Sequence, residues 1–552
     1  MPNKESAHYN KCVENQPIFM HHKNWIHVRK KLLSQIKKQV AIRLGPISKD
    51  LRDYYQEYQR EFKGAWRESS KEELYSQLIH KTQLVLGGDF HAYSQSQRAH
   101  LRVIRKLIKY RKISLALECF ESKDQLILDK FMAGKLTEKS FLKKINWQKN
   151  WGFKWSYYKP LVEFAKKNHI NIFGINHYYN ERSRENLRQR DFHAAELLYG
   201  ICNLNPNNLV YCVYGDLHLA EDHLPFYLEE IDNTLKKTII FQNSETLYFQ
   251  LAKKNLENRV EVLKTGYSKF CVITSPPWVK WQSYLIFLEE NFDQDIHEDL
   301  DLTDHIREQV LFLARELKLK INTDKLGVYT SSDSYIGEII ETKNAENDIQ
   351  VIQYFIKNDW SFFLPREGLL YLSRFTVNHS ATLTGYFLQA EYSNRKEFPW
   401  RMPNDFLGNI WLEAIGYFFS KIINHKRKSE SLTDLKTQLS ATQSKEGGRE
   451  ALLLSLDQRL CELLIQQGHS DLKRKFYPKN MFVYFESARI LGHMLGEKIY
   501  LAYRMERITP KEFKKYLGYD IFAPDFPEKY YNVVRKVENM NVPTSLGGVI
   551  YA

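Results

Sequence analysis

Short runs of consecutive apolar residues alternate with amphipathic segments between residues 81 and 250. The runs are "QLVLGG" (83–88), "ISLALE" (113–118), "INIFGIN" (170–176), "LVYCVYG" (209–215) and "KTIIFQN" (237–243). Because their apolar positions are consecutive rather than alternating, the runs predict strands that are buried on both faces. Segments with helical spacing, at 94–110 and 157–169, lie between them. This alternation predicts an α/β fold with a largely parallel sheet flanked by helices.

The hydrophobic pattern changes on both sides of this zone. Residues 1–80 are polar with helical spacing, and residues 271–552 are mostly helical, with wide apolar stripes such as the one at 481–505. A polar stretch at 425–450 predicts a loop or connector. We therefore expect a helical N-terminal segment over 1–80, an α/β domain over 81–270, and a large, mostly α-helical C-terminal region over 271–552.

Composition and charge narrow the class of protein. Hydrophobic residues make up 43% of the 552 residues and charged residues 26%, which is ordinary for a globular protein. The net charge is +14, but the basic residues are spread along the chain and no nucleic-acid-binding motif accompanies them, so we expect no nucleic-acid partner. The six cysteines form no CxxC pair, which argues against a disulfide framework or a thiolate zinc site and suits a reducing compartment.

The sequence shows no sign of a membrane span or a secretory signal. The first residues lack an apolar core segment of the signal-peptide type. The most apolar stretch, 410–423, is interrupted by Glu413 and Lys421, so it falls short of the uncharged run of about 18 residues that a span needs. We expect a soluble, cytoplasmic protein.

The same tetrapeptide pattern, Gly-Asp-x-His, follows two of the predicted strands. It reads Gly-Asp-Phe-His at 88–91 and Gly-Asp-Leu-His at 215–218. Ligands of an open parallel sheet bind beyond the carboxyl ends of the strands. Asp89, His91, Asp216 and His218 are therefore expected to face one shared cleft.

Further polar residues are predicted at the same edge of the sheet. Glu118 follows the run that begins at 113, and His177 follows the run 170–176. In the helical segment 185–200, Asp191 lies on the apolar face, beside Arg190. A carboxylate in an apolar stripe needs a partner, because its unpaired burial is costly. We expect Asp191 or Arg190 to reach inward and support the site.

These residue types allow a few kinds of chemistry. His91, His218, Asp89 and Asp216 are natural ligands of a divalent metal ion. Alternatively, an acid beside an imidazole fixes its tautomer and makes a general base, with His91, Asp89, Glu118 and His218 as candidate catalytic residues. A structural interpretation also remains, in which each Asp caps the following helix and each His is only solvated.

Taken together, the motifs resemble the ChaN family of haem-binding proteins, which shares a superfamily with the Tiki metalloproteases, the TraB proteins and the erythromycin esterases. The superfamily's Gly-Glu-x-His motif is similar to residues 88–91, and its next acidic residue matches Glu118. A Gln followed by a Gly is similar to 122–136, and the Arg-Asp/Asn-x-x-Met-Ala motif resembles 190–195. A second Gly-x-x-His matches 215–218. Asp89 stands where the family has Glu, and Ala194 where it has Met.

The resemblance covers about residues 81–245 and implies two alternatives. As a ChaN-like binding protein, the chain would hold haem near the cleft, with His91, His218, Arg190 and Asp191 around the cofactor and a Tyr as axial ligand. The tyrosines that follow candidate strand ends are Tyr93, Tyr178 and Tyr179. As a hydrolase of the Tiki or erythromycin esterase type, it would activate water with a His–acid pair, with or without a metal ion. The sequence leaves open which alternative holds, which small molecule or peptide is bound, and whether a homodimer forms.

Overall fold

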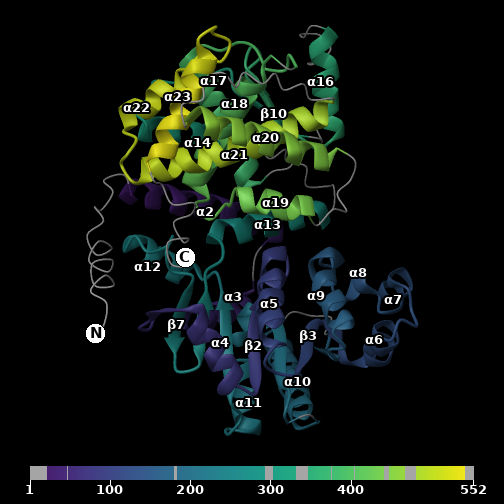
Figure 1. Ribbon diagram of the computed structural model, residues 1–552. Coiled ribbons are helices and arrows are strands. Elements are labelled where there is room, and N and C mark those ends of the chain that lie inside the picture. The colour runs from purple at the N-terminus through teal and green to yellow at the C-terminus, as the bar shows by residue number, and fades with distance from the viewer. Residues whose placement is uncertain are drawn as a thin grey trace, which may run out of the picture. The chain divides into compact units, whose positions relative to one another are not determined.

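The structure, a computed structural model, divides the chain into two compact units (Figure 1). One unit comprises residues 30–293, and the division falls inside helix α2 (His22–Leu44). The other unit contains the remaining part of the chain that is described. The described residues are 22–45, 48–178, 183–204, 206–291, 302–330, 346–373, 376–402, 404–440, 447–466 and 480–540.

The unit of residues 30–293 is built on an eight-stranded sheet with the strand order β1-β7-β8-β6-β2-β5-β3-β4. The strands are β1 (Arg67–Ser69), β2 (Leu84–Asp89), β3 (Ile113–Glu121), β4 (Ile172–Asn176), β5 (Leu209–Gly215), β6 (Lys237–Gln242), β7 (Val262–Gly266) and β8 (Lys269–Val272). All five apolar runs of the sequence form strands of this sheet.

The centre of the sheet is parallel, as the continuous apolar runs predict. β2 pairs in parallel with β5 and β6, and β3 pairs in parallel with β5 and β4. Only β7 and β1, at one edge, run antiparallel to their neighbours. The predicted fold class is therefore confirmed, and the carboxyl ends of β2, β5, β3 and β4 lie at one edge.

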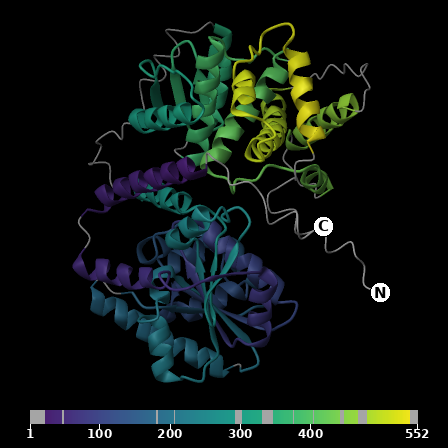
Figure 2. The same ribbon diagram turned by 90° about the vertical axis from the view of Figure 1, so that its left-hand side faces the viewer.

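Helices cover both faces of this sheet (Figure 2). The helices of this unit are α3 (Lys49–Arg60), α4 (Lys71–His80), α5 (Ser94–Leu107), α6 (Gln125–Met132), α7 (Glu138–Lys144), α8 (Trp147–Asn150), α9 (Trp155–Lys167), α10 (Arg184–Leu204), α11 (Leu224–Ile231), α12 (Glu245–Lys253) and α13 (Pro277–Asn291), with short 3-10 turns η1 (Ser122–Asp124) and η2 (Asp216–Leu219). α5 packs against α9, whereas α10 packs against α11 and α3. Because crossovers between parallel strands are right-handed, these two groups lie on opposite faces.

One hydrophobic core joins the sheet to the α4, α5 and α9 side. Leu115 and Tyr211, on neighbouring strands, are fully buried in it, as are Leu78 of α4 and Ile104 of α5. Burial of such side chains is the main stabilising contribution to the fold. The core holds the strands rigidly, so the residues at their carboxyl ends have fixed positions.

The other unit is mainly helical, in agreement with the sequence pattern. Its elements are α14 (Leu302–Glu316), β9 (Gly327–Thr330), α16 (Glu346–Lys357), β10 (Phe362–Leu364), β11 (Leu369–Leu372), α17 (Val377–Ser393), α18 (Phe406–Ile423), α19 (Leu432–Ser440), α20 (Gly448–Gln466), α21 (Met481–Arg504), α22 (Pro510–Leu517) and α23 (Phe526–Asn539). The small sheet β10-β11-β9 was not expected. α19 lies inside the polar stretch 425–450, because Leu435 packs into a small apolar cluster.

Glycines set the spacing of α17, α18 and α21. A Cβ atom on Gly385 would lie 2.9 Å from the Cα of Gly416, and one on Gly492 would lie 2.2 Å from the Cβ of Glu413. The helix backbones therefore approach each other more closely than side chains would permit. Among the described helices, none is both long enough and apolar enough to cross a membrane.

Candidate functional site

The two Gly-Asp-x-His motifs lie side by side at the carboxyl ends of β2 and β5. These strands are neighbours, and Asp89 is paired with Gly215 across the ladder. From β2 the chain continues into α5 on one face of the sheet, and from β5 it continues into α11 on the other. Adjacent strands whose connections leave on opposite faces form a topological switch point, which is where α/β sheets bind ligands.

His91 is held by the acid of its own motif. Its Nδ1 lies 2.9 Å from Asp89 Oδ2, and Asp89 also accepts hydrogen bonds from Gln97 Nε2 at 2.6 Å and from the Tyr158 hydroxyl at 2.9 Å. Burial opposes ionisation of Asp89, but the hydrogen bond and charge of His91 outweigh it and lower the pKa of Asp89. Because an ionised carboxylate only accepts, the Nδ1 of His91 carries a proton, which leaves the Nε2 lone pair open.

The negative charges around His91 favour its protonated form. Burial lowers the pKa of His91, but the charge of Glu118 and the hydrogen bond to Asp89 raise it above its ordinary value. The Nε2 atom of His91 lies 3.6 Å from Glu118 Oε2. His91 is therefore suited to accept a proton and to hold it as an imidazolium ion.

His218 has a different acid partner from the one its motif suggests. Its Nδ1 lies 2.6 Å from Oδ1 of Asp191, a fully buried residue of α10, and 2.8 Å from the hydroxyl of Tyr54. That hydroxyl donates to the other oxygen of Asp191 at 2.7 Å. Asp191 lies on the apolar face of α10, so its carboxylate points into the protein and bonds the imidazole of His218. The sequence predicts such a partner, because unpaired burial of a carboxylate is costly.

Glu118 is fixed between a guanidinium and a backbone amide. Its Oε1 accepts a hydrogen bond from Arg190 at 2.5 Å, and its Oε2 accepts one from the N–H of Gly215 at 2.6 Å. β3 leaves its register with β4 just after Leu117. This bulge places Glu118 beyond the last residue of β3 that pairs with β5, so its side chain reaches the same edge.

Both imidazoles and Glu118 converge over Gly215. The position that a Cβ atom would take there lies 3.2 Å from His91 Nε2, 3.2 Å from His218 Cδ2 and 3.3 Å from Glu118 Oε2. A side chain at 215 would crowd all three groups, so glycine lets them lie this close together. These three side chains, with the acids that hold the two imidazoles, form an acid–imidazole cluster.

Asp216 does not belong to the acid–imidazole cluster. Its Oδ1 would lie only 1.9 Å from a Cβ atom on Gly88, so the glycine of the first motif makes room for the acid of the second. Burial raises the pKa of Asp216 to about 6, against the attraction of Lys280. The two motifs therefore place their acids in different surroundings. The carboxylate of Asp89 is ionised and bonds an imidazole, whereas burial favours the protonated form of Asp216.

Aromatic side chains from outside the motifs surround His91. Its ring lies 4.6 Å from that of Trp151 and 5.2 Å from that of Phe153. Phe153 in turn stacks on Phe287 of α13 at 4.6 Å. The side chain of His91 is 22% exposed, whereas that of His218 is 8% exposed, so the acid–imidazole cluster is reached from the His91 side.

A second group of polar side chains lies at the carboxyl end of β4. The rings of His177 and His193 are 5.2 Å apart, and His193 Nε2 lies 3.1 Å from the hydroxyl of Ser122. Burial and the charge of His177 lower the pKa of His193, which keeps its ring neutral. His177 and the adjacent Tyr178 are exposed.

The candidate tyrosines differ in accessibility. Tyr93 is 6% exposed and precedes the first turn of α5, whereas Tyr178 is 46% exposed. Tyr179 lies outside the described residues. Of the candidates that the structure describes, Tyr178 is therefore the one that an external ligand reaches.

Several residues that support the acid–imidazole cluster carry no signal in the sequence. Tyr54, Gln97 and Tyr158 hold the two acid–imidazole pairs but lie on helices without a motif. Tyrosine is common throughout the chain, so its presence on α3 or α9 signals nothing. Within the described residues, no group of three His, Cys, Asp or Glu side chains is arranged to hold a metal ion.

Comparisons with known proteins concern the same part of the chain. One solved structure that it resembles, "Cofacial heme binding to ChaN of Campylobacter jejuni", has 16% identity and a TM-score of 0.25 over 32% of this chain and 88% of that one. None of the curated proteins compared matches the chain. A family described as "Haem-binding uptake, Tiki superfamily, ChaN" matches residues 75–197. Over these residues, the resemblance to ChaN that the motifs indicate is thus confirmed.

Proposed function

We propose that the α/β unit binds haem at the carboxyl end of β4, with Tyr178 as the axial ligand. The observation that carries the proposal is the exposed phenol of Tyr178 at the ligand-binding edge of the sheet, within the stretch that matches the haem-binding uptake family. Tyrosine is one of the side chains by which proteins hold haem iron.

The neighbours of Tyr178 fit such a ligand. His177 directly precedes it in the chain, and the ring of His193 lies 5.2 Å from that of His177. Burial and His177 lower the pKa of His193, which favours a neutral imidazole there. A neutral imidazole can donate a hydrogen bond to a phenolate ligand. When bound, haem would supply the iron, and these side chains would orient it.

The acid–imidazole cluster fits haem less well. His91 Nε2 and His218 Cδ2 each lie 3.2 Å from the position of a Cβ atom on Gly215, so the two imidazoles are too close together for a tetrapyrrole between them. A clamp of haem between His91 and His218 is therefore not proposed. We therefore propose the haem site and the acid–imidazole cluster as two separate groups on one sheet edge.

A haemin titration of the full chain, followed by absorbance, tests the proposal. We expect a saturable Soret band at one haem per binding unit, and a loss of affinity on the order of tenfold or more in Tyr178→Phe. The matched control is Tyr110→Phe, because Tyr110 is also exposed but lies just before β3, at the other end of the strands. Unsaturable binding, or equal affinity of the two variants, would contradict the proposal.

The acid–imidazole cluster favours a second candidate function, hydrolysis of a small ester or peptide bond. Two imidazoles, each with Nδ1 held by a carboxylate, face one point beside a Glu–Arg pair. A carboxylate that fixes the tautomer and a lone pair on Nε2 make a general base. The raised pKa of His91 lets it retain the proton taken from water.

The roles of the residues follow from these contacts. A water molecule bound at His91 Nε2 would give its proton to that atom, while Asp89 stabilises the imidazolium through Nδ1–H. Arg190 holds Glu118 in place and offsets its charge. Asp191 orients His218, whose ring forms the opposite side of the point.

Hydrolysis of p-nitrophenyl esters and of a peptide library by the full chain tests this candidate. We expect His91→Ala to lower kcat/KM by about a hundredfold or more, since a general base contributes at least that much. His80→Ala serves as the control, because His80 is exposed at the end of α4. Turnover that survives His91→Ala would remove the candidate, and loss of turnover on chelation with recovery on adding back a divalent ion would show that a metal takes part.

A further inference from the structure

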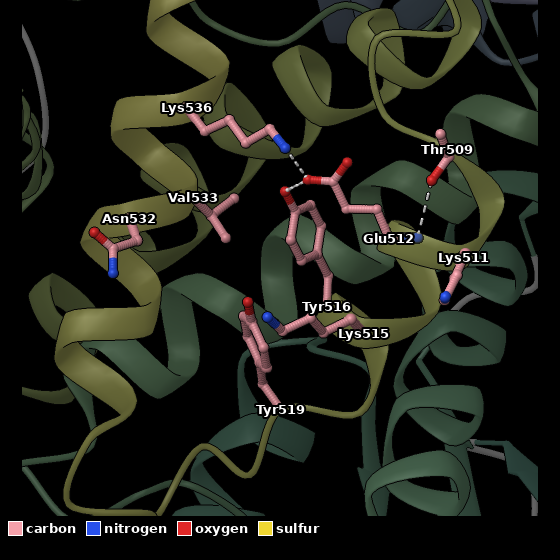
Figure 3. A pocket seen from close by; sticks show the side chains of 9 residues that line it. All are labelled: Thr509, Lys511, Glu512, Lys515, Tyr516, Tyr519, Asn532, Val533 and Lys536. Carbon is pink, nitrogen blue, oxygen red and sulfur yellow. Dashed lines mark hydrogen bonds and ion pairs between the residues drawn. The ribbon is translucent and has the colours of Figure 1, made fainter.

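A pocket of about 470 Å³ lies between α22 and α23 in the helical unit (Figure 3). Figure 3 shows Lys536 and Val533 of α23 facing Tyr516 of α22 across it, with Tyr519 below. A volume of this size is in the range of pockets that take small organic ligands. No part of this pocket belongs to the α/β unit, and neither proposed function uses it.

The charge of the pocket is positive. Lys536 and the hydroxyl of Tyr516 both bond the carboxylate of Glu512 (Figure 3). Burial opposes ionisation of this carboxyl, but these hydrogen bonds lower the pKa of Glu512, so it stays charged and neutralises Lys536. Lys511 and Lys515 also line the pocket, and neither has a hydrogen bond or ion pair within the described part of the chain. Two ammonium groups are thus left to attract an anion.

Next to Lys515 the pocket is aromatic and firmly supported (Figure 3). The ring of Tyr519 stacks on fully buried Trp411, with centroids 5.5 Å apart. Tyr516 is itself buried and lies 5.8 Å from Tyr519. Val533 adds an apolar surface. A flat ligand ring placed against Tyr519 would gain stacking and apolar contact. Because these side chains are already held in place, binding would not have to fix them first.

We propose that this pocket binds a small phosphorylated compound with a planar ring, of the nucleoside monophosphate class, with its phosphate on Lys511 and Lys515 and its ring against Tyr519. Lysine binds phosphate as a point charge, and two lysines match the two charges of a phosphate monoester. Lys511 also lies in the first turn of α22, where the helix dipole favours an anion. The polar groups of Asn532 and Thr509 on the rim remain for the ring substituents or the sugar.

Calorimetric titration of the full chain with AMP tests the proposal. We expect saturable binding with a Kd on the order of 1 mM or tighter. Lys511→Gln and Lys515→Gln should each weaken it about fivefold or more, and the double variant should abolish it, because each removes one charge from the phosphate site. Lys396→Gln is the matched control, since Lys396 is exposed in the same unit but outside the pocket. Thermal unfolding of each variant verifies that the fold is kept.

Two further ligands separate the two parts of the proposed site. Adenosine carries the ring without the charge, and inorganic phosphate carries the charge without the ring. Binding of AMP that is tighter than both supports the proposed site. Inorganic phosphate that binds as tightly as AMP, a Lys396→Gln variant as weak as Lys515→Gln, or no binding of AMP would each overturn it.

Discussion

The two Gly-Asp-x-His motifs have the same residues but different partners. In the first, Asp89 holds His91 of its own motif. In the second, His218 is held by Asp191 of α10, while Asp216 lies against Gly88 and is shifted toward its protonated form. Which carboxylate bonds each imidazole therefore depends on the helix that covers the strand end. The motif supplies the imidazole, and the tertiary fold decides which acid orients it.

The two imidazoles should differ in how much stability their removal costs. His218→Ala leaves the fully buried carboxylate of Asp191 with Tyr54 as its remaining bonded partner, so we expect it to lower the free energy of unfolding by about 3 kcal/mol. His91→Ala should cost about 1 kcal/mol, because Asp89 keeps Gln97 and Tyr158. Urea unfolding of both variants measures the difference. Equal losses would contradict the observed pairing.

The buried carboxyl of Asp216 should make stability depend on pH. Its folded pKa of about 6 is above the ordinary value of 3.8, so the folded state binds more protons than the unfolded state between these pH values. The free energy of unfolding should therefore fall as pH rises from about 4 to about 6, by about 3 kcal/mol from this group. Asp216→Asn should remove that part of the pH dependence. If the free energy of unfolding depends on pH in the same way in the wild type and in the variant, the pKa of Asp216 is not raised.

The sequence predicts which residues meet at the sheet edge better than it predicts their pairing. Strand-end position placed His91, His218 and Glu118 together, because parallel strands bring their carboxyl ends to one edge. The bond between His218 and Asp191 joins β5 to α10, and Tyr54 reaches it from α3. Such contacts depend on helix packing, which leaves no local signal in a single sequence.

At the scale of elements, burial decides what can be predicted. The central strands are covered on both faces, so their sequences are continuous apolar runs. β1 is three residues long and mostly exposed, and β7 is only partly buried, so neither shows such a run. α19 is similar: it is short and polar, and contacts the apolar cluster mainly through leucines at helical spacing such as Leu435. Short edge elements are recognised from their neighbours rather than from their own residues.

The close contact of α18 and α21 should not tolerate a side chain at position 492. Gly492→Ala would place a Cβ 2.2 Å from the Cβ of Glu413 and 2.7 Å from the carbonyl of Ile410, so the helices must separate. We expect a loss of about 2 kcal/mol or more in the stability of the helical unit, measured by calorimetry.

Gly408→Ala is the control for this contact, because its Cβ would meet Ile521 at 3.5 Å, an ordinary distance. It should leave stability unchanged or raise it by up to about 1 kcal/mol through helix propensity. A Gly492→Ala variant as stable as Gly408→Ala would contradict the packing of the two helices.

At the scale of the whole molecule, the limits of the α/β domain remain a proposal. The sequence predicts residues 81–270 as the domain, whereas the compact unit is 30–293. α3 supplies Tyr54 to the acid–imidazole cluster, and α4 supplies Leu78 to the core. We propose that the longer segment is the part that folds independently.

Two fragments of the chain should therefore differ in stability. A fragment of residues 30–293 should show one cooperative unfolding transition by circular dichroism. A fragment of residues 81–270 should be less stable by several kcal/mol or fail to fold, because it lacks α3, α4 and α13. Equal stability of the two fragments would show that the outer helices are dispensable. Neither result depends on which ligand the protein binds.

One sheet edge of the α/β unit, as we propose, carries two separate groups: a haem-binding surface at Tyr178 and an acid–imidazole cluster at His91 and His218. Their separation is tested by the haem affinity of the full chain, measured by absorbance titration of the wild type, of Tyr178→Phe and of the double variant His91→Ala, His218→Ala. Thermal unfolding identifies the fraction of each variant that is folded, and affinities are compared for that fraction.

We predict that Tyr178→Phe weakens haem binding on the order of tenfold or more, while the double histidine variant stays within about threefold of the wild type. The two groups should act independently, because His91 and His218 lie too close together around Gly215 to hold a tetrapyrrole between them, whereas Tyr178 is exposed. The opposite pattern, in which loss of His91 and His218 abolishes haem binding and Tyr178→Phe leaves it intact, would place haem at the acid–imidazole cluster and contradict the proposed separation.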